Sequence, residues 1–148
     1  MKLSGKTAVI TGGNRDIGFA AASAFLKEGA RVILTASRKE SAGEAAEALS
    51  DAYPGAIVEG ICPDLSVWEE VQEAFRLIYE KYGSLDILIN NAEVSDSTPL
   101  EKYSEEIFDK VMDLNVKSVF FCSKAAVQYM EKHGRGVIIN TSSVAGCQ

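Results

Sequence analysis

Cysteine and histidine are both scarce in this 148-residue chain, which has three cysteines and one histidine. Cys62, Cys122 and Cys147 lack the spacing of a metal-binding motif, and their odd number favours free thiols over a disulfide framework. His133 precedes Gly134 at the end of a helical pattern, where an exposed helix cap is a simpler interpretation than a catalytic role. The sequence therefore predicts no metal site and no disulfide-stabilised fold.

Excess positive charge and long apolar segments are lacking as well. Asp and Glu outnumber Lys and Arg by 21 to 15, and the net charge of -6 disfavours a general nucleic-acid or anionic-membrane surface. No apolar run approaches the length of a membrane span, and Met1–Gly5 leads into a strand pattern rather than a signal-peptide core. We therefore expect a cytoplasmic protein that binds neither nucleic acid nor membrane.

Apolar residues, in contrast, make up 47% of the chain, which is enough for the core of one domain over residues 1–148. Short strand patterns alternate with helical patterns along its length. This alternation predicts an α/β fold of the Rossmann-like, doubly wound type, with helices on both faces of a parallel sheet in the order 3-2-1-4-5. The expected strands are 7–10, 31–36, 56–61, 85–89 and 137–141, and the last expected helix runs from about 104 to 132.

Apolar spacing and capping residues predict further details of the helices. A capping box of Ser66 and Glu69 is expected to begin the third helix, and Gly83 to end it. The first helix is expected to bury the face that carries Ile17, Ala20, Ala21, Ala24 and Phe25.

The segment Thr11–Gly18 joins the first strand pattern to the first helical pattern. Its glycines suit a turn that approaches a phosphate closely, and free N–H groups at a helix start favour a bound diphosphate. Such a loop alone is a weak indication, since similar loops occur where nothing binds. Polar residues also follow each of the other four strands, at the sheet edge where open parallel sheets bind ligands: Ser37–Arg38, Asp64, Asn90–Glu93 and Ser142–Ser143.

In this order, the segments resemble those of the short-chain dehydrogenase/reductase family, especially its 3-oxoacyl-acyl-carrier-protein-reductase-like members. The resemblance covers the whole chain and implies hydride transfer between a nicotinamide cofactor and a small carbonyl or alcohol substrate, with a 3-oxoacyl thioester as a family-level candidate. It also implies that the full-length form is a homo-oligomer. The matching motifs are Thr11-Gly12-(x)3-Asp16-Ile17-Gly18, Asp64-Leu65, Asn90-Asn91-Ala92, Asn115-Val116 and Ile139–Gly146.

The resemblance also implies a set of cofactor-binding residues. Asp64 has a simpler interpretation as a turn or N-cap residue before the third helix, and the two roles are compatible. For Asn90 the preferred interpretation is structural, as a side chain that ties neighbouring strands together. By the resemblance, the diphosphate and adenosine ribose are surrounded by Gly12, Asn14, Arg15, Ile17 and Gly18, the adenine is bound by Asp64 beside Leu65, and the ribose side is lined by Asn91 and Ala92.

The end of the second strand indicates which cofactor is preferred. A carboxylate there would bind a ribose 2′-hydroxyl and repel a 2′-phosphate, but the segment Thr35–Arg38 contains no acid. Arg38 offers a planar fork suited to phosphate, Ser37 a hydroxyl, and Arg15 a second positive charge. We therefore expect NADP(H) in preference to NAD(H). The alternative is that Arg38 and Lys39 form a solvated basic turn.

Carbonyl reduction needs a proton donor and groups that stabilise the developing oxyanion. The resemblance assigns these roles to a serine, a Tyr-x-x-x-Lys pair and an asparagine that supports a water relay. Ser143, rather than Ser142, matches the serine, and Asn115 in the long helix matches the asparagine. Their simpler interpretations are a small turn residue after the fifth strand and a polar residue that bonds locally within the helix.

The Tyr-x-x-x-Lys pair does not occur: none of the five tyrosines precedes a lysine by four positions, and the pair is expected beyond Gln148. We therefore expect the N-terminal part of a longer reductase, poor in turnover and marginal in stability. Its fifth strand would be an exposed sheet edge that favours self-association. The alternative is a noncatalytic Rossmann-like module that binds a nucleotide or a partner protein.

Two acidic residues depart from the family pattern, since Asp16 and Glu93 both stand where glycine is usual. Each adds negative charge near a cofactor that carries phosphates, a repulsion of up to roughly 3 kcal/mol at about 5 Å and an effective dielectric constant of about 20. Arg15 is expected to offset part of it. Asp16 also has a benign interpretation as a helix cap. The alternative for Glu93 is a side chain that points to solvent.

Overall fold

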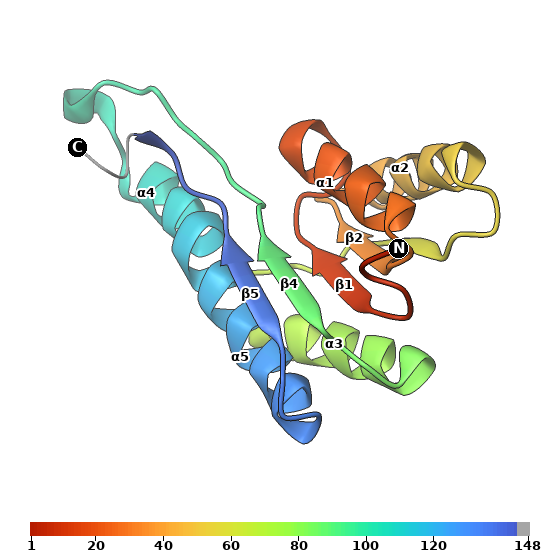
Figure 1. Cartoon of the computed structure of the whole chain (residues 1–148). Helices are drawn as coiled ribbons and strands as arrows, with labels where there is room; N and C mark the ends of the chain where they lie inside the picture. Colours follow the sequence, from red (N-terminus) through yellow and green to blue (C-terminus); the bar gives the residue numbers. More distant parts are fainter. Residues whose placement is uncertain (145–148) are drawn as a thin grey trace.

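The computed structural model describes residues 1–144 and has a parallel five-stranded sheet between two layers of helices (Figure 1). The strand order β3-β2-β1-β4-β5 confirms the predicted Rossmann-like topology, and the strand bounds differ from prediction by no more than two residues. The strands are β1 (Thr7–Ile10), β2 (Arg31–Thr35), β3 (Val58–Ile61), β4 (Ile87–Asn90) and β5 (Val137–Asn140).

The helices follow the predicted alternation, with one difference near the end of the chain. The expected long helix is divided into two α-helical parts by a π-helical segment, η2 (Asp113–Lys117), and a short 3-10 turn, η1 (Leu100–Lys102), precedes it. The α-helices are α1 (Asp16–Lys27), α2 (Lys39–Ala52), α3 (Trp68–Tyr82), α4 (Glu105–Met112) and α5 (Ser118–Lys132).

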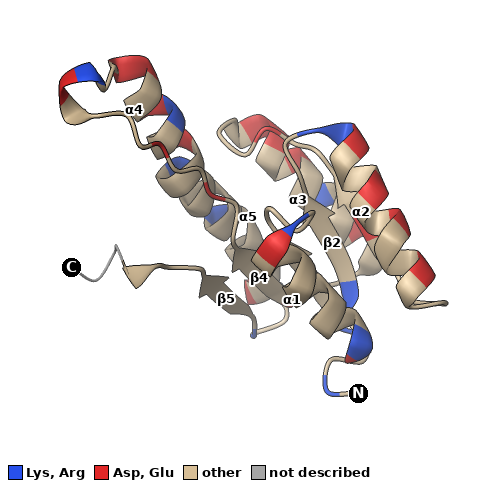
Figure 2. Ribbon diagram, turned by 90° about the horizontal axis from the view of Figure 1, so that it is seen from above, with Lys and Arg blue, Asp and Glu red and all other residues tan. Residues whose placement is uncertain are grey.

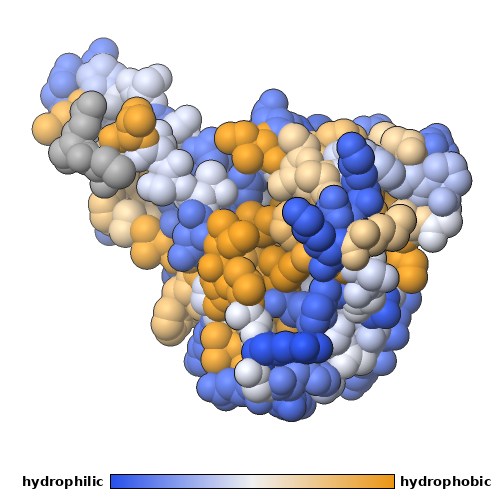
Figure 3. All heavy atoms as spheres, viewed as in Figure 1, coloured by the Kyte–Doolittle hydropathy of each residue, from blue (hydrophilic) through white to orange (hydrophobic). Residues whose placement is uncertain are grey.

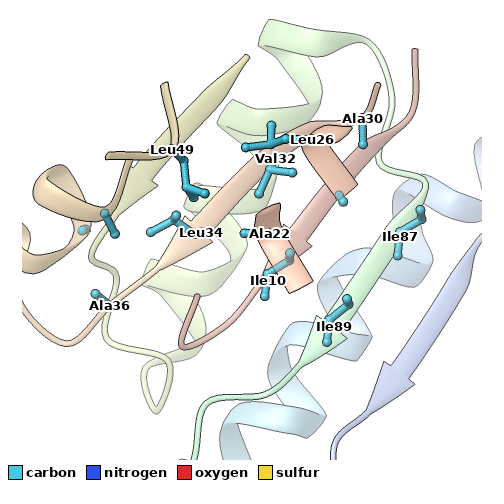
Figure 4. Packing of buried hydrophobic residues seen from close by; sticks show 13 residues of the cluster. Ile10, Ala22, Leu26, Ala30, Val32, Leu34, Ala36, Leu49, Ile87 and Ile89 are labelled. Atoms are coloured by element: carbon cyan, nitrogen blue, oxygen red, sulfur yellow. The ribbon is translucent and has the colours of Figure 1, made fainter. Parts of the chain in front are cut away.

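Successive residues of a buried parallel strand point to opposite faces, and both faces of this sheet are apolar. On one face, α1 and α2 pack against Ile10, Leu34 and Ile89 in the first core cluster (Figure 4). On the other face, α3 and α5 pack against Val9 and Leu88 in the second cluster. The alternation of the strands therefore builds two cores on one sheet.

The buried face of α1 differs from the prediction. Ile17 is 68% exposed, and the buried residues are Gly18, Ala22 and Leu26. The helix is apolar almost all round, so its periodicity could not select a face. Ala22 and Leu26 pack against the sheet, and Gly18 packs against the loop after β1, where a Cβ at position 18 would lie 2.2 Å from the carbonyl oxygen of Gly12.

The predicted capping box of the third helix is also wrong. Helix α3 has Val67 at its N-cap and no side-chain cap hydrogen bond. The backbone N–H and the hydroxyl of Ser66 both donate to Oδ1 of Asp64, at 2.9 and 2.7 Å, so a tight turn holds Ser66 outside the helix. Gly83 ends the helix as predicted, with a φ of 72° at the C-cap.

The expected sheet edge at β5 is confirmed. Val137 and Ile139 pair in register with Ile87 and Ile89, and they are 54% and 45% exposed. Within residues 1–144, no helix covers β5 on the side of α1 and α2, and an apolar surface is visible there (Figures 1 and 3). No helix in the same part of the chain is long and apolar enough to cross a membrane.

Candidate cofactor and active site

The carboxyl ends of the central strands lie level with one another. Ile10 in β1 pairs with Leu34 in β2 and with Ile89 in β4, so the loops that follow these strands leave the sheet at the same height. Asn90 pairs with Asn140 in β5 in the same way. The segments that the sequence placed at one sheet edge are therefore neighbours in space.

Thr11 connects the loops after β1 and β4. Its hydroxyl accepts hydrogen bonds from the N–H groups of Asn91 at 2.9 Å and Ala92 at 3.0 Å, and it contacts the carbonyl of Ile89 at 3.4 Å. The residue is 2% exposed. From the sequence alone, Thr11 is only the first residue of the glycine loop. Its position between a strand and that loop was the one available signal of this central role.

Gly12 and Gly18 allow the backbone segments to meet closely, and together with Asn91 and Ala92 they form what we term the glycine cradle. A Cβ on Gly12, which has a φ of 62°, would lie 2.9 Å from the Cα of Ala92. A Cβ on Gly18 would lie 2.2 Å from the Gly12 oxygen and 2.7 Å from Nδ2 of Asn91. These contacts leave no room for side chains, so the loop presents backbone at the helix start, as phosphate binding requires.

Asn91 links this cradle to the fifth strand. Its Nδ2 donates to the Gly12 oxygen at 3.3 Å, and its Oδ1 accepts a hydrogen bond from the Thr141 hydroxyl at 3.2 Å. On the β2 side, the Thr35 hydroxyl accepts from the Gly12 N–H at 3.3 Å. Residues from four strand ends are therefore joined by hydrogen bonds around Gly12.

The other expected cofactor residues of the segment Thr11–Gly18 differ in exposure. Asn14 is partly buried, whereas Arg15 and Ile17 are exposed. Asp16 has a φ of 48°, and its Oδ2 lies 3.8 Å from Nε of Arg15. The interpretation of Asp16 as a helix cap is wrong, because Arg15 holds the N-cap position and α1 has no side-chain cap hydrogen bond.

Ser37 and Arg38 follow β2 and are exposed at the same sheet edge. Arg38 occupies the N-cap position of α2 without a side-chain cap hydrogen bond. Seen from above, basic residues mark the beginning of α2 (Figure 2). The segment thus presents positive charge to solvent beyond the end of β2.

Asp64 adopts the turn that its simpler interpretation predicts. Hydrogen bonds from the Ser66 hydroxyl and N–H lower the pKa of the Asp64 carboxyl, with a smaller contribution from Lys117. Leu65 is 7% exposed and belongs to the second core cluster. A cavity of about 630 Å³ adjoins Asp64, and its other lining residues, none of which belongs to the glycine cradle, are Ser66, Glu105, Glu106, Asp109, Lys110, Asp113 and Leu114.

Asn115 lies in the π-helical segment and bonds outside its own helix. Its Oδ1 accepts from the N–H of Val94 at 2.9 Å, and its Nδ2 donates to the Val94 oxygen at 2.8 Å. Its interpretation as a locally bonded helix residue is therefore wrong. The pair of bonds fixes the loop after β4 to the long helix.

Ser142 and Ser143 follow β5 and are exposed. The Ala145-Gly146 part of the motif that distinguishes Ser143 from Ser142, and Cys147, lie outside the described residues. Asn90 is 4% exposed and donates to Asn140 at 2.8 Å and to Ser123 at 3.1 Å, which confirms that it ties neighbouring elements together.

The remaining reactive side chains are two cysteines and one histidine. Cys62 is an exposed free thiol, and Cys122 is a buried one whose pKa burial raises to about 12. His133 is the exposed C-cap of α5, as predicted, and its Nε2 lies 3.3 Å from the Tyr79 hydroxyl. In the part of the chain that the structure describes, no three His, Cys, Asp or Glu residues are grouped to hold a metal ion.

The sequence profile of the family described as short chain dehydrogenase matches residues 6–148. The chain belongs to this family. A family relative, the 3alpha-hydroxysteroid dehydrogenase of Mediterraneibacter gnavus, is 44% identical over 144 residues, which cover 97% of this chain and 58% of the relative. A 3-oxoacyl-acyl-carrier-protein reductase of Vibrio cholerae is 36% identical over 146 residues, or 99% of this chain and 58% of the reductase.

Solved structures of the family agree with the fold. A metagenomic short-chain oxidoreductase in complex with NADP has a TM-score of 0.93 and 33% identity, with all of this chain and 66% of the other covered. An NAD+-bound xylitol dehydrogenase also has a TM-score of 0.93, at 28% identity, with 100% and 56% covered. The chain thus spans somewhat more than half the length of the relatives it matches.

Proposed function

We propose that residues 1–148 form a single NAD(P)-binding domain of a short-chain oxidoreductase, which transfers hydride between a nicotinamide and a carbonyl or alcohol. The observation that carries this proposal is the glycine cradle, in which Gly12 and Gly18 lie against Asn91 and Ala92 without space for a Cβ. Exposed backbone at the start of α1 suits a diphosphate, which the helix dipole and free N–H groups stabilise.

The cofactor's other parts have suitable partners around this cradle. Asn14, Arg15 and Ile17 border the diphosphate and adenosine ribose in this assignment. Asp64 accepts a hydrogen bond from the adenine amino group in this assignment, and its carboxyl is held in a turn by hydrogen bonds from Ser66. Leu65 fixes the Asp64 turn through its buried side chain.

We propose NADP(H) as the preferred cofactor, with Arg38, Ser37 and Arg15 as the groups that contact the 2′-phosphate. The support is electrostatic, since Thr35 and Ala36 are buried at the end of β2 and no carboxylate follows them there. A guanidinium fork binds a phosphate dianion well and has no comparable partner in a ribose hydroxyl. Structural neighbours bind either NAD+ or NADP, so the charge at this strand end carries the assignment.

Two residues have proposed roles in catalysis. The Ser143 hydroxyl donates a hydrogen bond to the substrate oxygen, where negative charge develops during reduction. Asn115 supports a water relay, held in place through its two bonds with Val94. The nicotinamide supplies the hydride when bound. The chain contains no Tyr-x-x-x-Lys pair to deliver the proton, so we propose that it binds cofactor but turns over poorly as it stands.

The substrate is proposed to be a small carbonyl or secondary alcohol. The two relatives are named for a hydroxysteroid and a 3-oxoacyl-acyl-carrier protein, and both names describe the interconversion of a ketone and an alcohol. We retain the 3-oxoacyl thioester as the first compound to test. The exposed free thiol of Cys62 suits a reducing compartment, which supports the cytoplasm as the proposed location.

A second candidate function is a noncatalytic module that binds a partner or another copy through β5. The observation in its favour is the open strand edge with the exposed side chains of Val137 and Ile139. For the full-length form we propose a homo-oligomer.

Titration of NADPH fluorescence tests the leading function. We expect saturable binding that is weakened tenfold or more by Arg38→Asp, whereas Lys39→Asp, with the same charge change one position later, has a smaller effect. Equal affinity in wild type and Arg38→Asp would reject the 2′-phosphate assignment. Absence of binding for both NADPH and NADH in a folded chain would reject the cofactor site and favour the noncatalytic module.

A further inference from the structure

Two carboxylates flank the glycine cradle in this chain. Asp16 lies two residues before Gly18, whose Cα faces the Gly12 oxygen at a distance that excludes a Cβ. Glu93 directly follows Ala92, whose Cα would lie 2.9 Å from a Cβ on Gly12. Both acidic side chains are exposed. Each also lies within two residues of a cradle residue, close to the backbone that is proposed to bind the diphosphate.

Asp16 also has an unusual backbone conformation. Its φ of 48° makes it the one non-glycine residue in 1–144 with a positive φ, whereas the other six such residues are glycines. The left-handed region brings the Cβ of an L-residue close to the following carbonyl, and aspartate tolerates it better than most residues but less well than glycine. The loop therefore keeps a conformation that a glycine at position 16 would adopt without strain.

The positive charge available to offset these carboxylates is limited. Arg15 lies 3.8 Å from Asp16 through Nε and Oδ2, and the two side chains are 76% and 83% exposed. Because Arg15 pairs with Asp16, its positive charge attracts the diphosphate less strongly than the charge of an unpaired arginine would. Among the residues that the structure describes, the ion pairs do not include Glu93. Of the two carboxylates, only that of Asp16 has a cationic partner within 4 Å among residues 1–144.

We propose that Asp16 and Glu93 set the cofactor affinity of this site and hold it low by repelling the diphosphate, with the left-handed backbone at Asp16 adding to the effect. This inference rests on the proposed function, since it concerns the same cradle. The proposal distinguishes two parts of the ligand. Binding of the diphosphate at the cradle is disfavoured, whereas binding of a group that contacts only the Arg38 end is not.

Binding of NADPH by single and double variants tests the inference. The charge is removed without a change of shape by Asp16→Asn and Glu93→Gln, and both charge and backbone strain are removed by Asp16→Gly. We expect each neutral variant to bind NADPH several-fold more tightly than wild type, and Asp16→Gly with Glu93→Gly to bind at least tenfold more tightly. Glu47→Gln, which removes an exposed charge on α2, is the matched control and is expected to leave affinity unchanged.

A second ligand and a salt series locate the effect. Adenosine 2′-monophosphate has no diphosphate, so its affinity should be the same in wild type and in the double variant. The gain for NADPH in Asp16→Asn should shrink at 0.5 M salt, because exposed charges are screened over a few ångströms at that ionic strength. If Asp16→Gly binds NADPH more tightly and has a higher unfolding free energy, but Asp16→Asn binds like wild type, the effect of Asp16 comes from its backbone, and repulsion by its charge is rejected.

The outcomes separate this inference from the proposed function. Measurable NADPH binding that is equal in wild type and in the double variant overturns the inference and leaves the proposed function in place. Tight binding by the double variant alone supports both. If neither chain binds NADPH or NADH although both unfold cooperatively, the cofactor site itself is rejected, and the inference with it.

Discussion

The side chain of Asn115 forms two hydrogen bonds with the backbone of Val94, accepting from its N–H at 2.9 Å and donating to its carbonyl at 2.8 Å. The amide thus bonds to both backbone groups of Val94, as a paired strand would, in the loop after β4. Because both groups of Val94 are bonded to a single side chain, a change at Asn115 leaves a backbone donor and a backbone acceptor without their partners.

Removal of this side chain by Asn115→Ala should lower the unfolding free energy by about 1–3 kcal/mol, the usual cost of unsatisfied buried polar groups. Asn115→Asp should be as harmful, because it keeps an acceptor for the Val94 N–H but cannot donate to the carbonyl. Urea unfolding measures both, with Gln128→Ala on the exposed side of α5 as the control. Unfolding that is unaltered in Asn115→Ala would contradict a fixing role for the amide.

Gly18→Ala should disrupt the glycine cradle directly. The added Cβ would lie 2.2 Å from the Gly12 oxygen and 2.7 Å from Nδ2 of Asn91, so backbone has to move. We expect a loss of about 1–3 kcal/mol in stability and NADPH binding weakened at least tenfold. Gly43→Ala is the control, because position 43 in α2 has open space, and the change should stabilise the helix by about 0.5–1 kcal/mol. Wild-type NADPH affinity in Gly18→Ala would contradict the cradle.

Asp86 lies at the opposite end of the sheet and should control stability in acid. Burial raises the pKa of its carboxyl, but hydrogen bonds from the Thr7 N–H, Lys6 and Ser84 outweigh burial and hold the pKa below its ordinary value of 3.8. A lowered pKa in the folded state means that the ionised carboxylate stabilises the fold at neutral pH. This contribution is lost as the pH falls through the folded-state value.

We therefore expect Asp86→Asn to reduce the unfolding free energy at pH 7 by about 1–3 kcal/mol. The difference from wild type should stay constant down to about pH 4 and shrink below it. Chemical unfolding over a pH series measures the effect, and Asp51→Asn, at an exposed position of α2, serves as the comparison. A difference that grows as the pH falls would show that the sign of this linkage is wrong.

The open edge at β5 should make the chain associate with itself. Val137 and Ile139 expose about half of their surface beside unpaired strand backbone, a combination that favours edge-to-edge pairing. We expect concentration-dependent association in sedimentation velocity, and a decrease in Ile139→Lys because a charge at the edge opposes pairing. Leu77→Lys, at an equally exposed apolar position of α3, should leave association unchanged. A monomer at every concentration would contradict the prediction.

Several features of the site could be predicted from sequence because they depend on local chemistry. Glycines at 12 and 18 indicate close backbone approach whatever their partner, and a polar residue after a parallel strand lies at the carboxyl edge by topology alone. The role of Thr11 could not be predicted, because its hydroxyl bonds to Asn91 and Ala92, which are about 80 residues away in sequence. The capping role predicted for Ser66 is wrong because Asp64, two residues before it, accepts hydrogen bonds from both its N–H and its hydroxyl.

The order of strands and helices, the parallel sheet and the family can be predicted from the sequence, since they follow from alternating apolar periods and from motifs within short segments. Only the tertiary structure decided which face of α1 is buried and what Asn115 binds. An almost wholly apolar helix has no preferred side until Gly18 meets Gly12, and an amide has no defined partner until Val94 is brought beside it. The buried face of α1 and the partner of Asn115 both depend on contacts between distant segments, and local propensity does not predict such contacts.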